Sequence, residues 1–385
     1  MKATTLLLAI AIAMGTFLAL LPGASATEAT FGGSVQIDEH LAIGHSHDNV
    51  RSTGFDGLTT EAALKVAVDV SEHLSANVKL CYGCHGFETD MAYFDYRLGD
   101  ELNVRFGRFS PSFGNFNLRH DPGNHRLSDK PLPYDMGRML RLGAWNMGVL
   151  PSPFPDNGVE INGTHWSGEK VQLDYALYAV SGFKGDATAT DLDFAASRSL
   201  YYVDNNGRPT VGGRLASTAK IGPKSDATLG VCGMYGTFDP DHRLSYAIFG
   251  ADLTFRIART NVRAEYLARR ERFDVSDPSR FRFEVPATGG DFFTKHGAYV
   301  EIEQPIAPTV DLIGRVDGMY RAGNVLVGSP LSAHSSVVRY TLGAAIAVER
   351  NLRLKASTEL WHFSDVDPNG RHLELSFHLA ATATY

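Results

Sequence analysis

The chain has 385 residues, of which 21% are charged and 44% are hydrophobic, and its formal net charge is −7. The negative charge argues against a nucleic-acid partner, and only three cysteines in so long a chain exclude a scaffold held together by disulfides. A membrane barrel is compatible with this ordinary composition, because lipid-facing and lumen-facing residues alternate along each strand and average out.

Residues 1–26 have the order of a secretory signal peptide. Lys2 is followed by an apolar run from Leu6 to Leu21, and Ala24-Ser25-Ala26 then precedes the polar Thr27. A charged start, an apolar stretch and a small-residue cleavage site in this order predict export with cleavage after Ala26. A retained membrane anchor is the alternative. Residues 27–385 contain no second apolar run long enough to cross a bilayer as a helix.

Alternation of apolar and polar residues is the strongest pattern in the remaining chain, and it is typical of half-buried strands. In the last segment every odd position from Leu373 to Tyr385 is apolar. Sixteen such segments begin near residues 31, 60, 75, 89, 102, 157, 171, 210, 226, 243, 260, 295, 309, 336, 352 and 372.

The connections between these segments alternate in length. Long or polar connections (42–58, 183–209, 272–294 and 321–335) take turns with tight ones such as Ser71-Glu72-His73 and Gly99-Asp100. This alternation predicts an all-β fold, an up-and-down antiparallel transmembrane barrel of about 16 strands. With an even number of strands, both termini lie on the short-turn side, the periplasm. A soluble β-sandwich is the alternative, and it does not explain the alternation.

Cys81-Tyr82-Gly83-Cys84-His85 follows the C-x-x-C-H pattern, which is the attachment signature of c-type haem. The parity of the third strand directs Cys81 into the lumen together with Lys79, whereas Cys84 faces the opposite way in a continued strand. Haem attachment therefore requires the strand to break around Gly83. Two alternatives stay open, namely a disulfide between the two cysteines and a zinc site.

A zinc site at this motif needs a fourth ligand, which His45 or His47 in the first outer loop offers. Cys232 lies apart from any such pattern, and we interpret it as a small strand residue.

The connection between the strands near 102 and 157 is by far the longest, and we expect residues 110–156 to form a functional loop. Residues 101–150 contain seven cations and four anions. Arginines in a narrow pore favour anions, because guanidinium is always charged and binds carboxylate or phosphate through two hydrogen bonds. Solvated or acid-paired arginines are the alternative. The candidate pore-lining residues are Arg105, Arg108, Arg119, Arg126 and Lys130. Arg105 is the best single candidate, because it alternates with the apolar Val104 and Phe106 and so faces the lumen.

The terminal strand that ends in the aromatic Tyr385 resembles the last strand of bacterial outer-membrane porins. The stretch from Arg105 to Gly114, RFGRFSPSFG, is similar to the G-R-F-x-x-P-F-G neighbourhood of the phosphate-selective porin O/P family, with altered spacing around Pro111 and Phe113. The resemblance implies a channel in the outer membrane for small hydrophilic solutes, with anions as candidates. It also implies that the long loop folds inward as a constriction and that three chains assemble as a homotrimer.

Similarity of the C-x-x-C-H motif to cytochromes c implies one haem c per chain, with Cys81 and Cys84 forming the thioethers and His85 as the proximal iron ligand. His45 and His47 are candidates for the distal ligand, and further candidates lie in the long loop: His120, His125, Met136, Met139 and Met147. A His ligand favours a lower potential than Met.

The sequence therefore predicts a haem-carrying porin, a channel rather than an enzyme. One alternative is an electron relay, which needs periplasmic or extracellular cytochromes as partners, because a single haem does not span a hydrocarbon core about 30 Å thick. The other alternative is a haem-based peroxidase or gas-ligand sensor on a barrel scaffold. It requires an open iron position.

Overall fold

The computed structural model describes residues 28–43, 57–83, 86–136, 138–141, 145, 148–184, 206–272, 283–284, 291–323, 325–326, 332, 334–366 and 370–385. The predicted signal peptide, residues 1–26, lies outside these ranges. Within them, no helix has the length and apolar character needed to cross a membrane.

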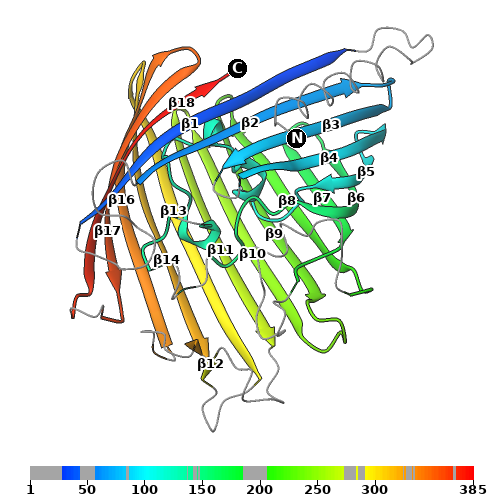
Figure 1. The fold of residues 1–385 in the computed structure, drawn as a ribbon. Helices are drawn as coiled ribbons and strands as arrows, with labels where there is room; N and C mark the ends of the chain where they lie inside the picture. The colour runs from blue at the N-terminus through cyan, green and yellow to red at the C-terminus, as the bar shows by residue number, and fades with distance from the viewer. Residues whose placement is uncertain are drawn as a thin grey trace, which may run out of the picture.

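Sixteen antiparallel strands close into one barrel, in which each strand pairs with its neighbours along the chain (Figure 1). The strands are β1 (Ala29–Ile43), β2 (Leu58–Asp69), β3 (Leu74–Gly83), β4 (Gly86–Gly99), β5 (Leu102–Phe109), β6 (Asp156–Ser167), β7 (Val171–Val180), β8 (Thr210–Gly222), β9 (Ser225–Thr237), β10 (Ser245–Ile257), β11 (Thr260–Arg272), β13 (Phe292–Ala307), β14 (Val310–Gly323), β16 (His334–Glu349), β17 (Leu352–Phe363) and β18 (Leu373–Thr384). Two short strands, β12 (Phe283–Glu284) and β15 (Val325–Leu326), pair with each other outside the barrel sheet.

The predicted barrel is confirmed strand by strand. Each of the sixteen strands begins within three residues of its predicted start, and only the two-residue pair of β12 and β15 has no counterpart among the predicted segments. The first and last strands complete the closure, with Ser34 opposite Thr384 in the register. Backbone hydrogen bonds in both directions join Gly33 and Tyr385. The start of β1 and the end of β18 therefore lie at the same end of the barrel, which is also the end with the tight turns.

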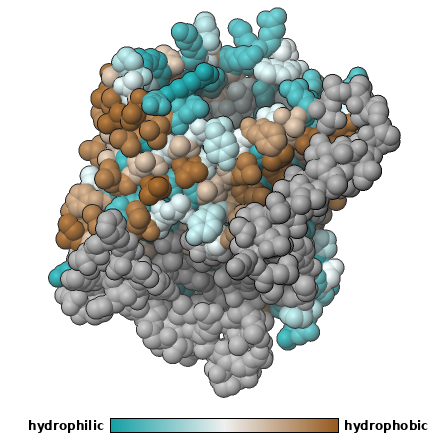
Figure 2. Space-filling view, turned by 45° about the horizontal axis from the view of Figure 1, so that its top comes forward, coloured by the Kyte–Doolittle hydropathy of each residue, from teal (hydrophilic) through white to brown (hydrophobic). Residues whose placement is uncertain are grey.

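The distribution of side chains is the reverse of that in a soluble protein. Outward positions carry exposed apolar residues such as Leu177 (71% exposed) and Leu379 (66%), whereas charged residues such as Arg339 and Glu359 are fully buried in the interior. Figure 2 shows the resulting hydrophobic band across the outer face, with hydrophilic residues toward the end that carries the tight turns. Apolar area turned outward around a charged interior defines a transmembrane barrel and excludes the soluble sandwich.

One connection on the long-loop side is short. Gly83 of β3 and Gly86 of β4 are register partners, so only Cys84 and His85 connect these two strands. The backbone of β3 stays extended and paired through Tyr82 and Gly83.

The longest connection joins β5 to β6 and is called the long loop below (residues 110–155). It contains three short 3-10 helices, η2 (Asn117–Arg119), η3 (Pro122–Asn124) and η4 (Leu132–Tyr134). Figure 1 shows this segment as a blue-green trace within the barrel. Its apolar side chains form the main hydrophobic core together with inward-facing residues of the wall.

Candidate functional site: the lumen and its long loop

The long loop packs by apolar contacts against the wall from β7 to β17. Phe113, Leu132 and Trp145 of the loop are fully buried in one cluster with Ile248 of β10 and Trp361 of β17. Each large apolar side chain buried in this way contributes roughly 1.5–3 kcal/mol to stability. Because the cluster extends over many strands, this side of the lumen is filled by side chains.

Glu265 of β11 holds the beginning of the long loop. Its carboxylate accepts hydrogen bonds from Tyr134 Oη at 2.6 Å, Tyr299 Oη at 2.9 Å and the backbone N–H groups of Asn115 at 2.6 Å and Phe116 at 3.2 Å. Donors from two separate parts of the loop therefore converge on one side chain of the wall. Charge-assisted hydrogen bonds of this kind are about twice as strong as neutral ones.

Asp129 fixes the middle of the long loop between two arginines of the wall. Its carboxylate pairs with Arg315 of β14 and lies 2.7 Å from Nη1 of Arg339 of β16. Arg339 also binds Asp317 at 2.5 Å and donates to the backbone oxygen of Lys130 at 2.8 Å. These buried charges are paired with opposite charges, which is the condition under which buried charges are tolerated.

The opposite wall, from β1 to β4, meets the long loop through polar side chains. Lys79 of β3 lies 2.6 Å from Asp121 and 2.7 Å from His120 Nε2, and Lys65 of β2 also pairs with Asp121. Burial raises the pKa of Asp121, but the neighbouring positive charges outweigh it and hold the pKa below its ordinary value. Asp121 thus stays ionised at neutral pH, and its contribution to stability is lost only as the pH falls through this lowered pKa.

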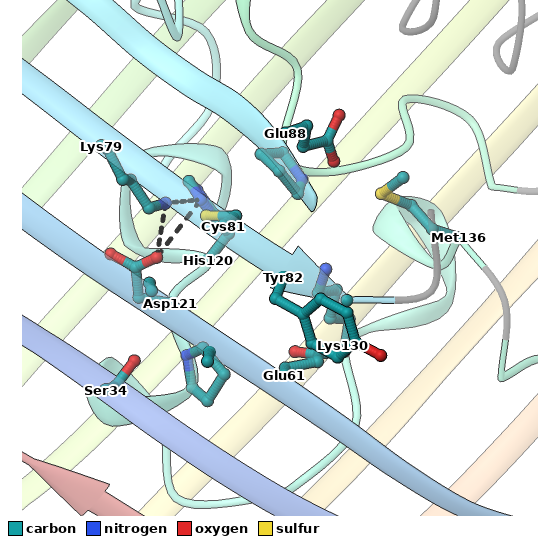
Figure 3. A pocket seen from close by; sticks show the side chains of 15 residues that line it. Ser34, Glu61, Lys79, Cys81, Tyr82, Glu88, His120, Asp121, Lys130 and Met136 are labelled. Atoms are coloured by element: carbon teal, nitrogen blue, oxygen red, sulfur yellow. Dashed lines mark hydrogen bonds and ion pairs between the residues drawn. The ribbon is translucent and has the colours of Figure 1, made fainter. Parts of the chain in front are cut away.

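Two small cavities lie between the long loop and the β1–β4 wall. One has a volume of about 70 Å³ and is lined by residues that include Lys79, Cys81, Asp121 and Lys130. The other, of about 80 Å³, is lined by residues that include Glu61, Lys130 and Arg138. Figure 3 shows the first cavity, with Lys79, His120 and Asp121 joined on one side and Met136 on the other.

A wider cavity of about 690 Å³ opens at the short-turn end. It is lined by the turn from Ser71 to Leu74 and by wall residues that include Asp95, Arg97 and Arg105. Among the described residues, a wide polar vestibule thus lies at the short-turn end, and only the two small cavities lie where the long loop meets the β1–β4 wall.

The predicted pore-lining residues lie in different surroundings. Arg105 faces the vestibule and binds Asp95 at 2.9 Å, as its strand parity predicts. Lys130 lines both small cavities and donates to the backbone oxygen of Ser152. Arg126 pairs with Asp311 at 2.9 Å, Arg119 donates to Asn115 at 2.7 Å, and Arg108 is buried with its Nε bonded to the backbone oxygen of Thr89.

The cations of the long loop are mostly paired with acids of the wall. Arg126 binds Asp311, Arg138 binds Asp38 and Glu61, and Arg141 binds Glu374. Among the residues that the structure describes, Arg119 and Lys130 have no carboxylate within ion-pair distance. The positive bias read from residues 101–150 is therefore largely neutralised by groups far away in the sequence.

Only part of the C-x-x-C-H motif falls within the described residues. Cys81 points into the lumen as a free thiol and lines the 70 Å³ cavity, and its neighbour Tyr82 is exposed outward, which agrees with the parity prediction. Cys84 and His85, as well as His45 and His47, lie outside the described ranges.

The described part of the motif comprises its first three residues, Cys81, Tyr82 and Gly83. The β3 backbone remains extended to Gly83, where the described part of the motif ends. His120 and Met136, two of the candidate distal ligands, do line the same cavity as Cys81.

Sixteen strands close into a barrel with an apolar exterior and a long segment inside the lumen, and these features define the class of this protein, a transmembrane β-barrel with the fold of porins. Solved structures of bacterial outer-membrane channels have this fold, so the predicted outer-membrane barrel is confirmed at the level of the fold.

One similar structure is the outer-membrane channel DcaP of Acinetobacter baumannii, with a TM-score of 0.58 at 13% identity, covering 95% of this chain and 100% of that one. The anion-selective porin of Comamonas acidovorans has a TM-score of 0.57 at 11% identity, with 94% and 100% covered. OmpF of Salmonella typhi, solved with daunomycin, has a TM-score of 0.56 at 8% identity, with 93% and 98% covered. No protein-family model and no curated protein sequence matches the chain.

Proposed function

We propose that this protein is a channel for small hydrophilic solutes in the bacterial outer membrane, and that solutes pass between the long loop and the β1–β4 wall. The observation that carries this route is the difference between the two sides of the loop. Apolar packing and buried ion pairs fill the side toward β7–β17, whereas two cavities with polar side chains lie on the side toward β1–β4.

The route carries charges of both signs. The linings of the two cavities include the cations Lys79, Lys130 and Arg138 and the anions Glu61, Glu88, Asp121 and Asp135. A mixed lining of this kind favours small polar solutes with weak selection by charge. The anion preference expected from the loop sequence then depends mainly on Lys130, which lines both cavities.

We expect the purified protein to form channels in planar lipid bilayers with a small reversal potential in a KCl gradient. Lys130→Glu should shift the reversal potential toward cation selectivity, because the substitution changes the sign of a charge at the narrow part of the route. Arg350→Glu, the same charge change at an exposed tight turn, is the matched control and should have a much smaller effect. Equal shifts in the two variants would exclude the proposed route.

We further propose that three chains assemble as a homotrimer. Support comes from OmpT of Vibrio cholerae, which was solved in a trimer form and has a TM-score of 0.53 to this chain at 10% identity.

A covalent haem at Cys81 and Cys84, with His85 as the proximal ligand, is a second proposal, and it rests on the motif and on the inward thiol of Cys81 beside His120 and Met136. It requires the end of the β3–β4 pair to open, since the described strand ends have no helical turn. The haem would make the lumen redox-active. In an electron relay a second protein ligand would bind the iron, whereas in a gas-ligand sensor or peroxidase that position of the iron would be open.

The test of the haem proposal is a pyridine haemochrome spectrum with haem staining of a denaturing gel, on protein produced together with the c-type maturation machinery. Covalent haem that is absent from the Cys81→Ala/Cys84→Ala variant would support it. Protein without haem in both samples, with normal channel activity, would reject the haem and leave the channel proposal intact.

A further inference from the structure

Three buried metal-ligating side chains meet where the barrel closes. His40 lies on β1, His378 on β18 and Glu359 on β17, which are consecutive strands in the sheet. His40 and His378 are register partners. One ligand atom of each of the three side chains lies within 4.8 Å of the others, and none of these residues is more than 5% exposed.

The two histidines each carry a buried ring nitrogen that forms no hydrogen bond within the described part of the chain, and that of His378 faces Glu359, with its Nε2 3.6 Å from Oε2 of the carboxylate. The corresponding nitrogen of His40 is also Nε2. A buried polar atom without a partner costs about 1–3 kcal/mol, so such atoms are uncommon unless they have another role. Two of them in one three-residue cluster indicate a ligand that both nitrogens share.

A second carboxylate orients one of the imidazoles. Nδ1 of His378 lies 3.0 Å from Oδ2 of Asp38. When Nδ1–H donates to this carboxylate, the lone pair is on Nε2, which is the arrangement seen in carboxylate–histidine–metal triads. Glu359 is oriented in a similar way, because its Oε2 accepts a hydrogen bond from Ser376 at 2.7 Å.

The surrounding charges favour a cation at this position. Ion pairs in the surrounding wall and loop join seven carboxylates to four guanidinium groups, which leaves three negative charges when the imidazoles are neutral: Asp38, Glu61, Asp129, Glu301, Glu303, Asp317 and Glu359 with Arg138, Arg263, Arg315 and Arg339. The next cation on β17, Lys355, donates to Gln36 and to the backbone oxygens of Pro122 and Leu127.

We propose that His40, His378 and Glu359 bind one divalent transition-metal ion, with Asp38 orienting His378. Two imidazoles and one carboxylate suit zinc, which binds such ligands at roughly 2.0–2.2 Å. The two rings are stacked with their centroids 4.1 Å apart. Coordination therefore turns them about their second side-chain torsion, which is a soft one. The ion cross-links the first strand of the barrel to its last two.

The experiment uses the full untagged chain in detergent, stripped of metal with a chelator. Zinc binding is measured by competition with a chromophoric chelator, and cobalt binding by its visible absorption. We expect one ion per chain and, with zinc, a higher midpoint of thermal unfolding, because a ligand that binds only the folded state stabilises it.

His40→Gln and His378→Gln should each abolish the cobalt absorption, and Asp38→Asn should weaken binding about 10- to 100-fold. His362→Gln, at an exposed position of the same β17, is the matched control. If the histidine variants do not fold, the cobalt spectrum of the Cys81→Ala/Cys84→Ala variant decides the question, because this variant lacks the other candidate zinc site. No stoichiometric binding by the unmodified protein would overturn the proposal. Unchanged binding in folded His40→Gln would also overturn it.

Discussion

Glu265→Ala is expected to release the beginning of the long loop and to raise single-channel conductance. The substitution removes the acceptor of four hydrogen bonds, two of them from the backbone of Asn115 and Phe116 and two from the hydroxyls of Tyr134 and Tyr299. Each buried donor left without a partner costs about 1–3 kcal/mol, so we expect the free energy of unfolding to fall by about 3 kcal/mol or more. Conductance is measured in planar bilayers, and stability by urea unfolding.

Two further variants test whether the effect of Glu265→Ala comes from the lost hydrogen bonds to the long loop. Glu265→Gln keeps an acceptor of the same size and should lie between the alanine variant and the unmodified protein. Glu349→Ala removes a carboxylate from an exposed tight turn and should change neither property. A folded Glu265→Ala variant with unchanged conductance would contradict the view that this carboxylate holds the loop across the lumen.

Arg339→Met is expected to destabilise the whole barrel by about 3–5 kcal/mol, because it leaves buried carboxylates without their counter-ion. Arg339 is fully buried and lies within ion-pair distance of Asp129, Asp317 and Glu359, which belong to the long loop and to two different strands. Adding Asp129→Asn to this variant should restore part of the lost free energy of unfolding, because it removes one of the uncompensated charges.

Arg256→Met is the matched control for the arginine variant. Arg256 pairs with Asp226 at a position where its side chain is 58% exposed, and such surface pairs contribute about 1 kcal/mol or less. Free energies of unfolding are obtained by linear extrapolation from urea curves. Losses of equal size in the two variants would show that the buried network contributes no more than a surface ion pair.

The strands could be predicted from the sequence because their signal is local. In a barrel between lipid and water, every second residue faces the opposite solvent, so alternation along a segment such as Leu373–Tyr385 reports the structure directly. The same parity placed Cys81 and Arg105 in the lumen. For these residues the prediction needed nothing beyond the segment itself.

The partners of the long loop could not be predicted in this way. Asp129 meets Arg315 and Arg339 across about two hundred residues of sequence, and Glu265 binds loop atoms nearly as remote. The composition of residues 101–150 predicted a positive constriction because it counts the cations of the loop without the wall acids that neutralise them. Parity places Glu265 in the lumen, but no local signal distinguishes it as the anchor of the loop.

The pairing of β1 with β18 sets the order of events in folding. Gly33 and Tyr385 exchange backbone hydrogen bonds although about 350 residues of sequence separate them. Until β18 pairs with it, β1 therefore exposes an edge of unpaired N–H and C=O groups. Such an edge is costly in lipid and can pair with another chain. Closure has to come last, and contacts so distant in sequence form slowly. The unpaired edge of β1 thus has to be kept from other chains until β18 (Leu373–Thr384) pairs with it and closes the barrel.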